Sequence, residues 1–146
     1  MTEPILAGPA EHAHRYVFER KVRFADIDSY GHVNNVRFFD YLEDARVSML
    51  WERPRDSDGN RLDLVVARQE IDYRRPLNFR PDPVRVEVWV TEISRSRFTL
   101  AYEIRDDATL YAEARTILVA YDSAAGWPRR LGEDEVAFLR RFSAPA

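Results

Sequence analysis

The chain has 146 residues, of which 45% are hydrophobic and 32% are charged, and it carries a formal net charge of −3 with a pI near 5.7. This length and composition predict one globular domain with a single core and argue against a disordered chain. The acidic balance argues against a broad nucleic-acid-binding surface, and the absence of cysteine excludes disulfides, thiolate metal sites and cysteine nucleophiles.

The N-terminal segment 1–14 is predicted to be a flexible lead-in to a domain that spans residues 15–146. Its sequence, MTEPILAGPAEHAH, lacks the basic start and the apolar core of a signal peptide. No apolar run in the chain reaches the roughly 18 residues that a membrane span needs. We therefore expect a cytoplasmic protein that does not act at a membrane. His12 and His14 stand two residues apart, but with no third ligand nearby they predict no metal site.

The first two elements are predicted from a change in hydrophobic period. Residues Tyr16–Phe24 alternate apolar and charged side chains, which is typical of a half-buried strand. In Val36–Glu52 the apolar residues recur at helical spacing, and no Pro or Gly interrupts them before Pro54. This pattern predicts a helix of four or five turns. Its buried stripe is expected to consist of Phe38, Leu42, Ala45 and Met49, joined by Phe39, Arg46 and Leu50.

The rest of the chain is predicted to be mainly strand. Four segments with a period of two follow the helix: Leu64–Tyr73, Val84–Ser94, Phe98–Asp106 and Thr109–Asp122. A last short helix begins at Glu133, with acids in its first turn and arginines in its last. One long helix and a five-stranded, mostly antiparallel sheet make a two-layer α+β domain. A single domain whose sheet wraps around one long apolar helix is the hot-dog arrangement.

The connection before the long helix, DIDSYGHVNNVR (residues 26–37), is unusually rich in polar residues. Asp26 and Asp28 fit positions one and three of a calcium-binding EF-hand loop. Tyr30 and Arg37 stand where that loop needs further oxygen ligands, and the preceding strand pattern conflicts with the incoming helix of an EF-hand. We therefore predict no calcium site here.

A different role follows from the position of this stretch between a strand and a helix. The first N–H groups of a helix lack partners within the helix and favour an oxyanion or a polarised carbonyl. Gly31 permits unusual dihedral angles and a close approach to a ligand, and either Asn34 or Asn35 can cap the helix. The carboxylate of Asp28 would then lie beside a group that polarises a carbonyl. This is the minimum equipment for hydrolysing an activated acyl group.

The segment VRFADIDSYGHVNNVRFFDYLEDAR (Val22–Arg46) resembles the signature of the 4-hydroxybenzoyl-CoA thioesterase-like hot-dog family of acyl-CoA thioesterases. The resemblance extends over roughly Tyr16–Tyr121, and outside the signature it rests on IDYRRPL (Ile71–Leu77) and on a basic turn. It implies hydrolysis of an acyl-CoA or acyl-carrier-protein (acyl-ACP) thioester without a metal or cofactor. It also implies a homodimer or homotetramer in which a neighbouring chain completes each site.

The resemblance further implies roles for individual residues of the signature. Asp28 would attack the thioester carbonyl or activate water to do so. Backbone N–H groups near Asn34 and Asn35 would polarise that carbonyl. His32 belongs to the same signature, but a simple hydrogen bond within the turn is an equal alternative for its side chain.

The basic turn that shares in the resemblance is Arg95, Ser96 and Arg97. In 4-hydroxybenzoyl-CoA thioesterases the corresponding turn meets the nucleotide phosphates of coenzyme A, so the resemblance implies a coenzyme A contact here. A solvated hairpin tip is the alternative, because arginine is frequent throughout this chain.

Several alternatives stay open at this point. The chain could be a non-catalytic acyl-thioester-binding module, an acyl-ACP thioesterase or a hot-dog hydratase, although a carboxylate in the loop before the helix favours hydrolysis. Asp26 is expected to pair with Arg23 or Arg37, and Glu43 with Arg46. The acyl group is not defined, because the aromatic residues that could shape its pocket could equally pack the core: Phe38, Phe39, Trp51 and Trp89.

Overall fold

The computed structural model describes residues 10–59 and 63–145. Residues 1–9 of the predicted lead-in lie outside the described residues, and Ala10–His12 form a short 3-10 turn, η1. A second such turn, η2, spans Phe24–Asp26, and the two α-helices are α1 (Asn35–Leu50) and α2 (Glu133–Arg140). The strands are β1 (Tyr16–Arg20), β2 (Leu64–Tyr73), β3 (Val84–Ile93), β4 (Arg97–Arg105), β5 (Leu110–Asp122) and β6 (Trp127–Pro128).

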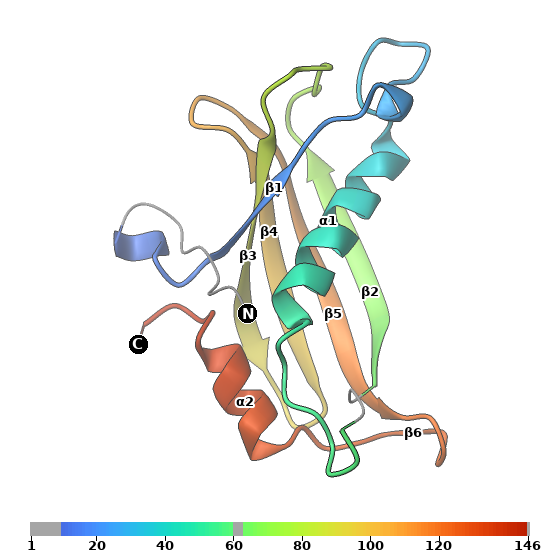
Figure 1. Cartoon of the computed structure of the whole chain (residues 1–146), viewed down its shortest axis with the longest axis vertical. Helices are drawn as coiled ribbons and strands as arrows, with labels where there is room; N and C mark the ends of the chain where they lie inside the picture. The colour runs from blue at the N-terminus through green and yellow to red at the C-terminus, as the bar shows by residue number, and fades with distance from the viewer. Residues whose placement is uncertain (1–9, 60–62, 146) are drawn as a thin grey trace.

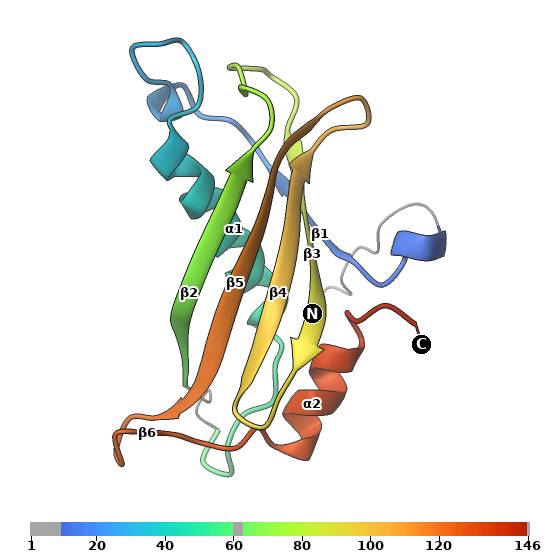
Figure 2. The same ribbon diagram turned by 180° about the vertical axis from the view of Figure 1, so that it is seen from behind.

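The main strands form one antiparallel sheet in the order β1-β3-β4-β5-β2. Helix α1 crosses one face of this sheet (Figure 1), and from the other side the sheet lies in front of the helix (Figure 2). The predicted hot-dog fold is therefore confirmed. The two-residue strand β6, which pairs with the end of β5, was not predicted, because two residues that include a proline show no period.

The predicted boundaries differ from the observed ones mainly at the end of β1. The strand stops at Arg20, whereas the sequence pattern continued to Phe24. Beyond Arg20 the chain turns away into η2, where the main-chain N–H of Asp26 donates to the carbonyl of Arg23 (2.9 Å). Phe24 is 79% exposed, so its place in the alternation did not reflect burial in the sheet.

The core lies between α1 and the inner face of the sheet. The predicted stripe of the helix is buried, because Phe38, Leu42, Ala45 and Met49 are at most 3% exposed, whereas Phe39 is partly buried. Alternate residues of the central strands face this stripe, as a period of two requires. They include Val86, Val88 and Val90 of β3, Leu100, Tyr102 and Ile104 of β4, and Ala112, Leu118 and Ala120 of β5. Each large side chain buried here contributes about 1.5–3 kcal/mol of stabilisation.

The edge strand β2 leads to a prediction about assembly. Among the described strands it pairs with β5 alone, on one side, and its ten residues include the exposed side chains of Val65 (42%) and Val66 (43%). Because a long unpaired edge favours pairing with another chain, we expect a homodimer in which two copies of β2 meet. Light scattering should give about twice the chain mass of 17.1 kDa at micromolar concentration.

The same strand provides the test of this dimer. The double substitution Val65→Lys and Val66→Lys should shift the protein towards monomer, because lysines on an edge oppose strand pairing. Val47→Lys, at a residue of α1 that is 51% exposed, should leave the dimer intact. A wild-type protein that scatters only as a 17.1 kDa monomer would contradict the prediction.

Candidate active site

Asp26 is a buried anchor at the start of the polar stretch. Its carboxylate accepts hydrogen bonds from the main-chain N–H of Arg23 (3.1 Å), the Arg23 guanidinium (2.9 Å) and the Tyr41 hydroxyl (2.8 Å). Burial alone would raise the pKa of Asp26, but the hydrogen bonds from Arg23 and Tyr41 outweigh it and hold the pKa below its ordinary value of 3.8. The expected pair with Arg23 is confirmed, whereas Arg37 pairs with Asp40 (2.8 Å). Asp26 therefore fastens the stretch to α1.

Asp28 lies in a tight turn that presents its carboxylate on the surface of a cleft. The Asp28 N–H donates to the carbonyl of His32 (3.0 Å), and the Gly31 N–H donates to the carbonyl of Asp28 (3.0 Å). Gly31 has φ of 85°, a conformation that other residues adopt at a cost. The carboxylate accepts from the Tyr30 N–H at Oδ1 (2.9 Å) and from the Asn34 side chain at Oδ2 (3.3 Å). The Asp28 carboxylate can therefore stabilise the turn and still contact a ligand, because a carboxylate has more lone pairs than these two donors use.

Asn34 is the N-cap of α1. Its side-chain oxygen accepts from the N–H of Val36 (2.9 Å), and its side-chain nitrogen donates to Asp28. One amide group thus connects the first turn of the helix to the carboxylate. Of the two possible caps, the structure selects Asn34 and leaves the side chain of Asn35 exposed.

The first-turn N–H groups of α1 are not equally available. The N–H of Asn34 donates to the carbonyl of Asp26 (2.9 Å), and that of Val36 is held by the cap. The N–H of Arg37 donates to the carbonyl of Asn34 (2.9 Å). Within residues 10–59 and 63–145, no acceptor is found for the N–H of Asn35. Of the two residues that the resemblance pointed to, Asn35 is therefore the one with a backbone donor to offer.

These groups line an open cleft of about 620 Å³ at the N-terminal end of α1. Its walls come from the polar turn, the start of the helix and the segment that follows β2: Asp28, Tyr30, His32, Val33, Asn34, Asn35, Val36, Phe38, Tyr73, Arg74, Arg75 and Pro76. The Tyr73 ring packs edge-on against Phe38, with 5.3 Å between their centroids. Tyr73 and its two arginine neighbours were not among the predicted site residues, and their only signal in the sequence was the segment IDYRRPL.

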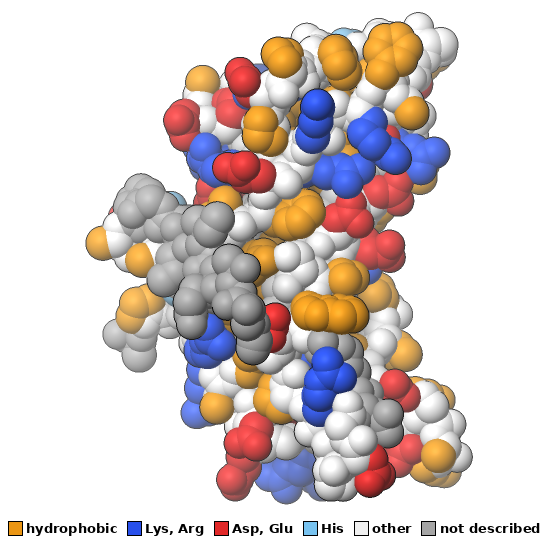
Figure 3. All heavy atoms as spheres, in the orientation of Figure 1, with side chains coloured by type: hydrophobic (Ala, Val, Ile, Leu, Met, Phe, Trp, Pro, Cys, Tyr) orange, Lys and Arg blue, Asp and Glu red, His pale blue; other side chains and the backbone are white. Residues whose placement is uncertain are grey.

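The surroundings of the cleft are partly apolar. Exposed aromatic residues include Tyr30 (85%), Phe24 (79%) and Phe79 (50%), and the last two meet edge-on at 5.8 Å. In the space-filling view, hydrophobic and basic side chains gather at the upper end of the face that carries α1 (Figure 3). Of the four aromatic residues considered for an acyl pocket, Phe38 lines this cleft, whereas Trp89 lies on the outer face of the sheet.

The basic turn lies at the opposite end of the sheet. Arg97 pairs in register with Val119 of β5, whereas Tyr73 pairs with Ala112. These two positions are separated by seven residues of a strand, or about 23 Å. The main chain of the turn is held by hydrogen bonds from Leu131 to the Arg95 carbonyl (2.9 Å) and from Ala120 to the Ser96 carbonyl (2.7 Å). One chain therefore does not bring this turn to Asp28.

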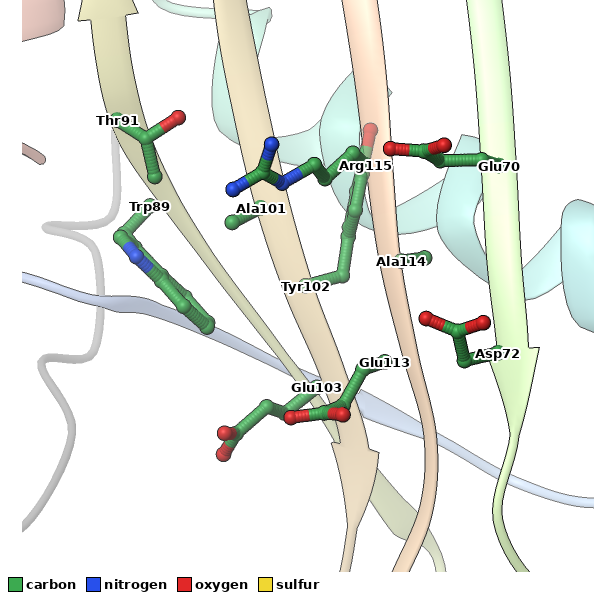
Figure 4. Close-up of a pocket in the computed structure, with 10 residues that line it drawn as sticks. All are labelled: Glu70, Asp72, Trp89, Thr91, Ala101, Tyr102, Glu103, Glu113, Ala114 and Arg115. Atoms are coloured by element: carbon green, nitrogen blue, oxygen red, sulfur yellow. The ribbon is translucent and has the colours of Figure 1, made fainter.

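A second hollow, of about 440 Å³, lies on the outer face of the sheet (Figure 4). A row of acids crosses this face in register: Glu87, Glu103, Glu113 and Asp72. Arg15 pairs with the first two acids (3.0 and 2.9 Å) and covers Trp89 at 3.8 Å, and Arg74 pairs with Glu113 (2.6 Å). The arginines offset a repulsion that would otherwise destabilise the sheet, so this row has a structural role.

Two further findings concern ions and membranes. Across the described part of the chain, no three His, Asp or Glu side chains gather in a way that could hold a metal ion. Among the described helices, none is long and apolar enough to cross a membrane.

Comparisons with known proteins relate the whole domain to one family. The sequence model of the thioesterase-like superfamily matches residues 22–145 of this chain. The chain is similar to 1,4-dihydroxy-2-naphthoyl-CoA hydrolase of Synechococcus elongatus, with 29% identity over 113 residues, 74% of this chain and 82% of that protein. It is also similar to long-chain acyl-CoA thioesterase FadM of Escherichia coli, with 39% identity over 62 residues, 38% of this chain and 44% of that protein. A crystal structure of a thioesterase from Thermus thermophilus, complexed with coenzyme A and zinc, is 30% identical, with a TM-score of 0.75 over 88% of this chain and 93% of that one.

Proposed function

The chain belongs to the thioesterase-like superfamily, and from this premise we propose that it hydrolyses an acyl-CoA to the free acid and coenzyme A. The cleft at the start of α1 would be the reaction site. The single observation that carries the proposal is that two groups of suitable chemistry line the same cleft. One is the carboxylate of Asp28, and the other is the N–H of Asn35, which has no acceptor among the described residues.

The chemistry needs little beyond these two groups. As a nucleophile, Asp28 attacks the thioester carbonyl carbon, the C–S bond breaks, coenzyme A leaves as a thiolate, and water then hydrolyses the acyl-aspartate anhydride. As a general base, Asp28 takes a proton from water, which attacks the same carbon directly; the C–S bond then breaks, and coenzyme A leaves as a thiolate that can take the proton from Asp28. In both routes the Asn35 N–H donates to the oxygen that becomes negative. One such donor is worth about a hundredfold to a thousandfold in kcat.

The side chain of Asn34 supports this arrangement. It contacts the Asp28 carboxylate through one atom and caps the N–H of Val36 through the other. The carboxylate and the first turn of the helix are therefore held relative to each other. Such a fixed geometry is what an active site needs, since reacting groups lose rate quickly when they are misplaced.

A screen of acyl-CoA substrates tests the proposal. Release of free coenzyme A thiol should be measured across acyl chain lengths and aromatic acyl groups. One relative named above is a long-chain acyl-CoA thioesterase, and the other is a hydrolase of the aromatic 1,4-dihydroxy-2-naphthoyl-CoA. Assaying the same acyl groups attached to acyl carrier protein shows whether the protein prefers coenzyme A or acyl carrier protein as the carrier. Binding without thiol release would indicate a non-catalytic module, and loss of the enoyl absorbance without thiol release would indicate a hydratase.

The basic turn gives a prediction about coenzyme A. The double substitution Arg95→Ala and Arg97→Ala should raise the KM for acyl-CoA about tenfold or more, because charge-assisted contacts to phosphate are strong. The value of kcat should fall less, since the nucleotide lies far from the bond that breaks. Because the turn and Asp28 lie at opposite ends of one chain, the contact would come from the neighbouring chain of the oligomer.

Acyl-pantetheine, which lacks the nucleotide, is the control substrate for this prediction. The double variant should hydrolyse it as the wild type does, and the matched variant Arg130→Ala with Arg140→Ala should leave both substrates unaffected. Equal losses on both substrates would mean that the turn acts through structure. An unchanged KM for acyl-CoA would make it a solvated hairpin tip.

A further inference from the structure

Tyr73, the last residue of β2, joins the sheet to the first turn of α1. Its hydroxyl donates a hydrogen bond to the main-chain carbonyl of Asn35 (2.9 Å), 38 residues away in the sequence. The ring packs edge-on against Phe38, which is buried. Partial burial raises the pKa of Tyr73, so the phenol keeps the proton that it donates.

The Tyr73 hydroxyl contacts the peptide group next to the one that carries the Asn35 N–H. The peptide between Asn35 and Val36 is held at both ends, because its carbonyl accepts from Tyr73 and its N–H donates to the Asn34 side chain. The Cα of Asn35 connects this peptide to the one that carries the Asn35 N–H. Fixing the first peptide restricts the dihedral angles at Asn35 and therefore the direction of that N–H.

We propose that Tyr73 is a positioning residue that aims the Asn35 N–H at the oxygen of the substrate carbonyl. The inference rests on the proposed thioesterase function and adds a residue that the sequence signature does not contain. Tyr73 acts through Asn35, since its hydroxyl proton is already used in the bond to the carbonyl. An oxyanion donor contributes to catalysis only when its direction is set before the charge develops.

Tyr73→Phe tests the proposal, because it removes the hydroxyl and keeps the ring against Phe38. We expect kcat to fall about 3–10-fold, as for the loss of one hydrogen bond, with KM within about twofold of the wild type. Tyr16→Phe is the matched control. The Tyr16 hydroxyl bonds to the hydroxyl of Ser48 near the other end of the same helix, so the control also loses one tyrosine contact to α1. It should leave kcat unchanged.

A second measurement does not depend on substrate. Amide hydrogen exchange, followed by NMR, should become faster at Val36 in Tyr73→Phe than in wild type, because the carbonyl of that peptide then loses the tyrosine hydroxyl and keeps only its bond within the helix. In Tyr16→Phe the exchange at Val36 should be unchanged. Faster exchange together with a lower kcat and an unchanged KM supports the proposal.

The other outcomes overturn it. Unchanged exchange at Val36 would mean that the hydroxyl does not order the turn, and faster exchange with an unchanged kcat would mean that the order does not serve the reaction. If both variants showed the same decrease in kcat, the same increase in KM and the same decrease in melting temperature, the effect would be a general structural one. A wild-type chain that hydrolyses none of the acyl-CoAs would instead overturn the proposed function, and the exchange comparison would still decide whether Tyr73 orders this turn.

Discussion

Replacing Asp28 by Asn is expected to lower kcat for acyl-CoA hydrolysis at least about a hundredfold, as loss of a positioned nucleophile or base does. The change removes the negative charge and the basicity and keeps the size of the side chain. An asparagine oxygen can still accept the hydrogen bond from the Tyr30 N–H, so the turn should stay intact. Circular dichroism and thermal melting should therefore match the wild type, while thiol release at saturating substrate shows the loss.

The neighbouring acid provides the control for this result. Asp26 stands two residues earlier, but its carboxylate is bound to Arg23 and Tyr41. Asp26→Asn, assayed at a temperature where it is folded, should keep most of the wild-type turnover. Near-wild-type turnover in Asp28→Asn would remove that residue from the mechanism.

The largest expected effect on stability is at Asp26. Asp26→Asn replaces the charged acceptor of a buried hydrogen-bond cluster, and we expect it to lower the free energy of unfolding by about 2–3 kcal/mol. For a domain of this length the melting temperature should fall by roughly 6–10 °C. The main-chain bond from the N–H of Asn34 to the carbonyl of Asp26 (2.9 Å) does not involve the substituted side chain, so the first turn of α1 should keep this contact.

The pH dependence of this effect has a definite sign. The folded pKa of Asp26 is held below the ordinary value of 3.8, so the charged carboxylate stabilises the fold above that pH. As the pH falls through the lower folded pKa, both states bind the proton and the contribution is lost. The difference in melting temperature between wild type and Asp26→Asn should be constant above about pH 5 and should narrow below about pH 4.

Asp40→Asn is the matched control for stability. Asp40 lies on α1 and pairs with Arg37, but the side chains of both residues are more than 40% exposed. An exposed pair contributes at most about 1 kcal/mol, so this variant should melt close to the wild type. Equal melting temperatures for Asp26→Asn and wild type at neutral pH would show that the buried cluster is not a source of stability.

The sequence was sufficient for features that depend on local pattern. The period of 3.6 in Val36–Glu52 identified the buried face of α1, and the period of two identified four strands to within one residue at either end. Gly31 marked the position that needs a positive φ. The signature around Asp28 predicted the family that the comparison with known sequences shows. Each of these follows from neighbours in the chain, because backbone geometry and side-chain direction repeat over a few residues.

Only the tertiary structure decided which groups meet. The Asn34 N–H is occupied because the Asp26 carbonyl reaches it across a turn, and this leaves Asn35 as the first-turn amide that has no acceptor among the described residues. Tyr73 reaches Asn35 because β2 ends beside the start of α1. The antiparallel register sends the turn around Arg95 to the far end of the sheet from Asp28. Contacts between residues so distant in sequence depend on how the sheet and helix pack, and no local period carries that information.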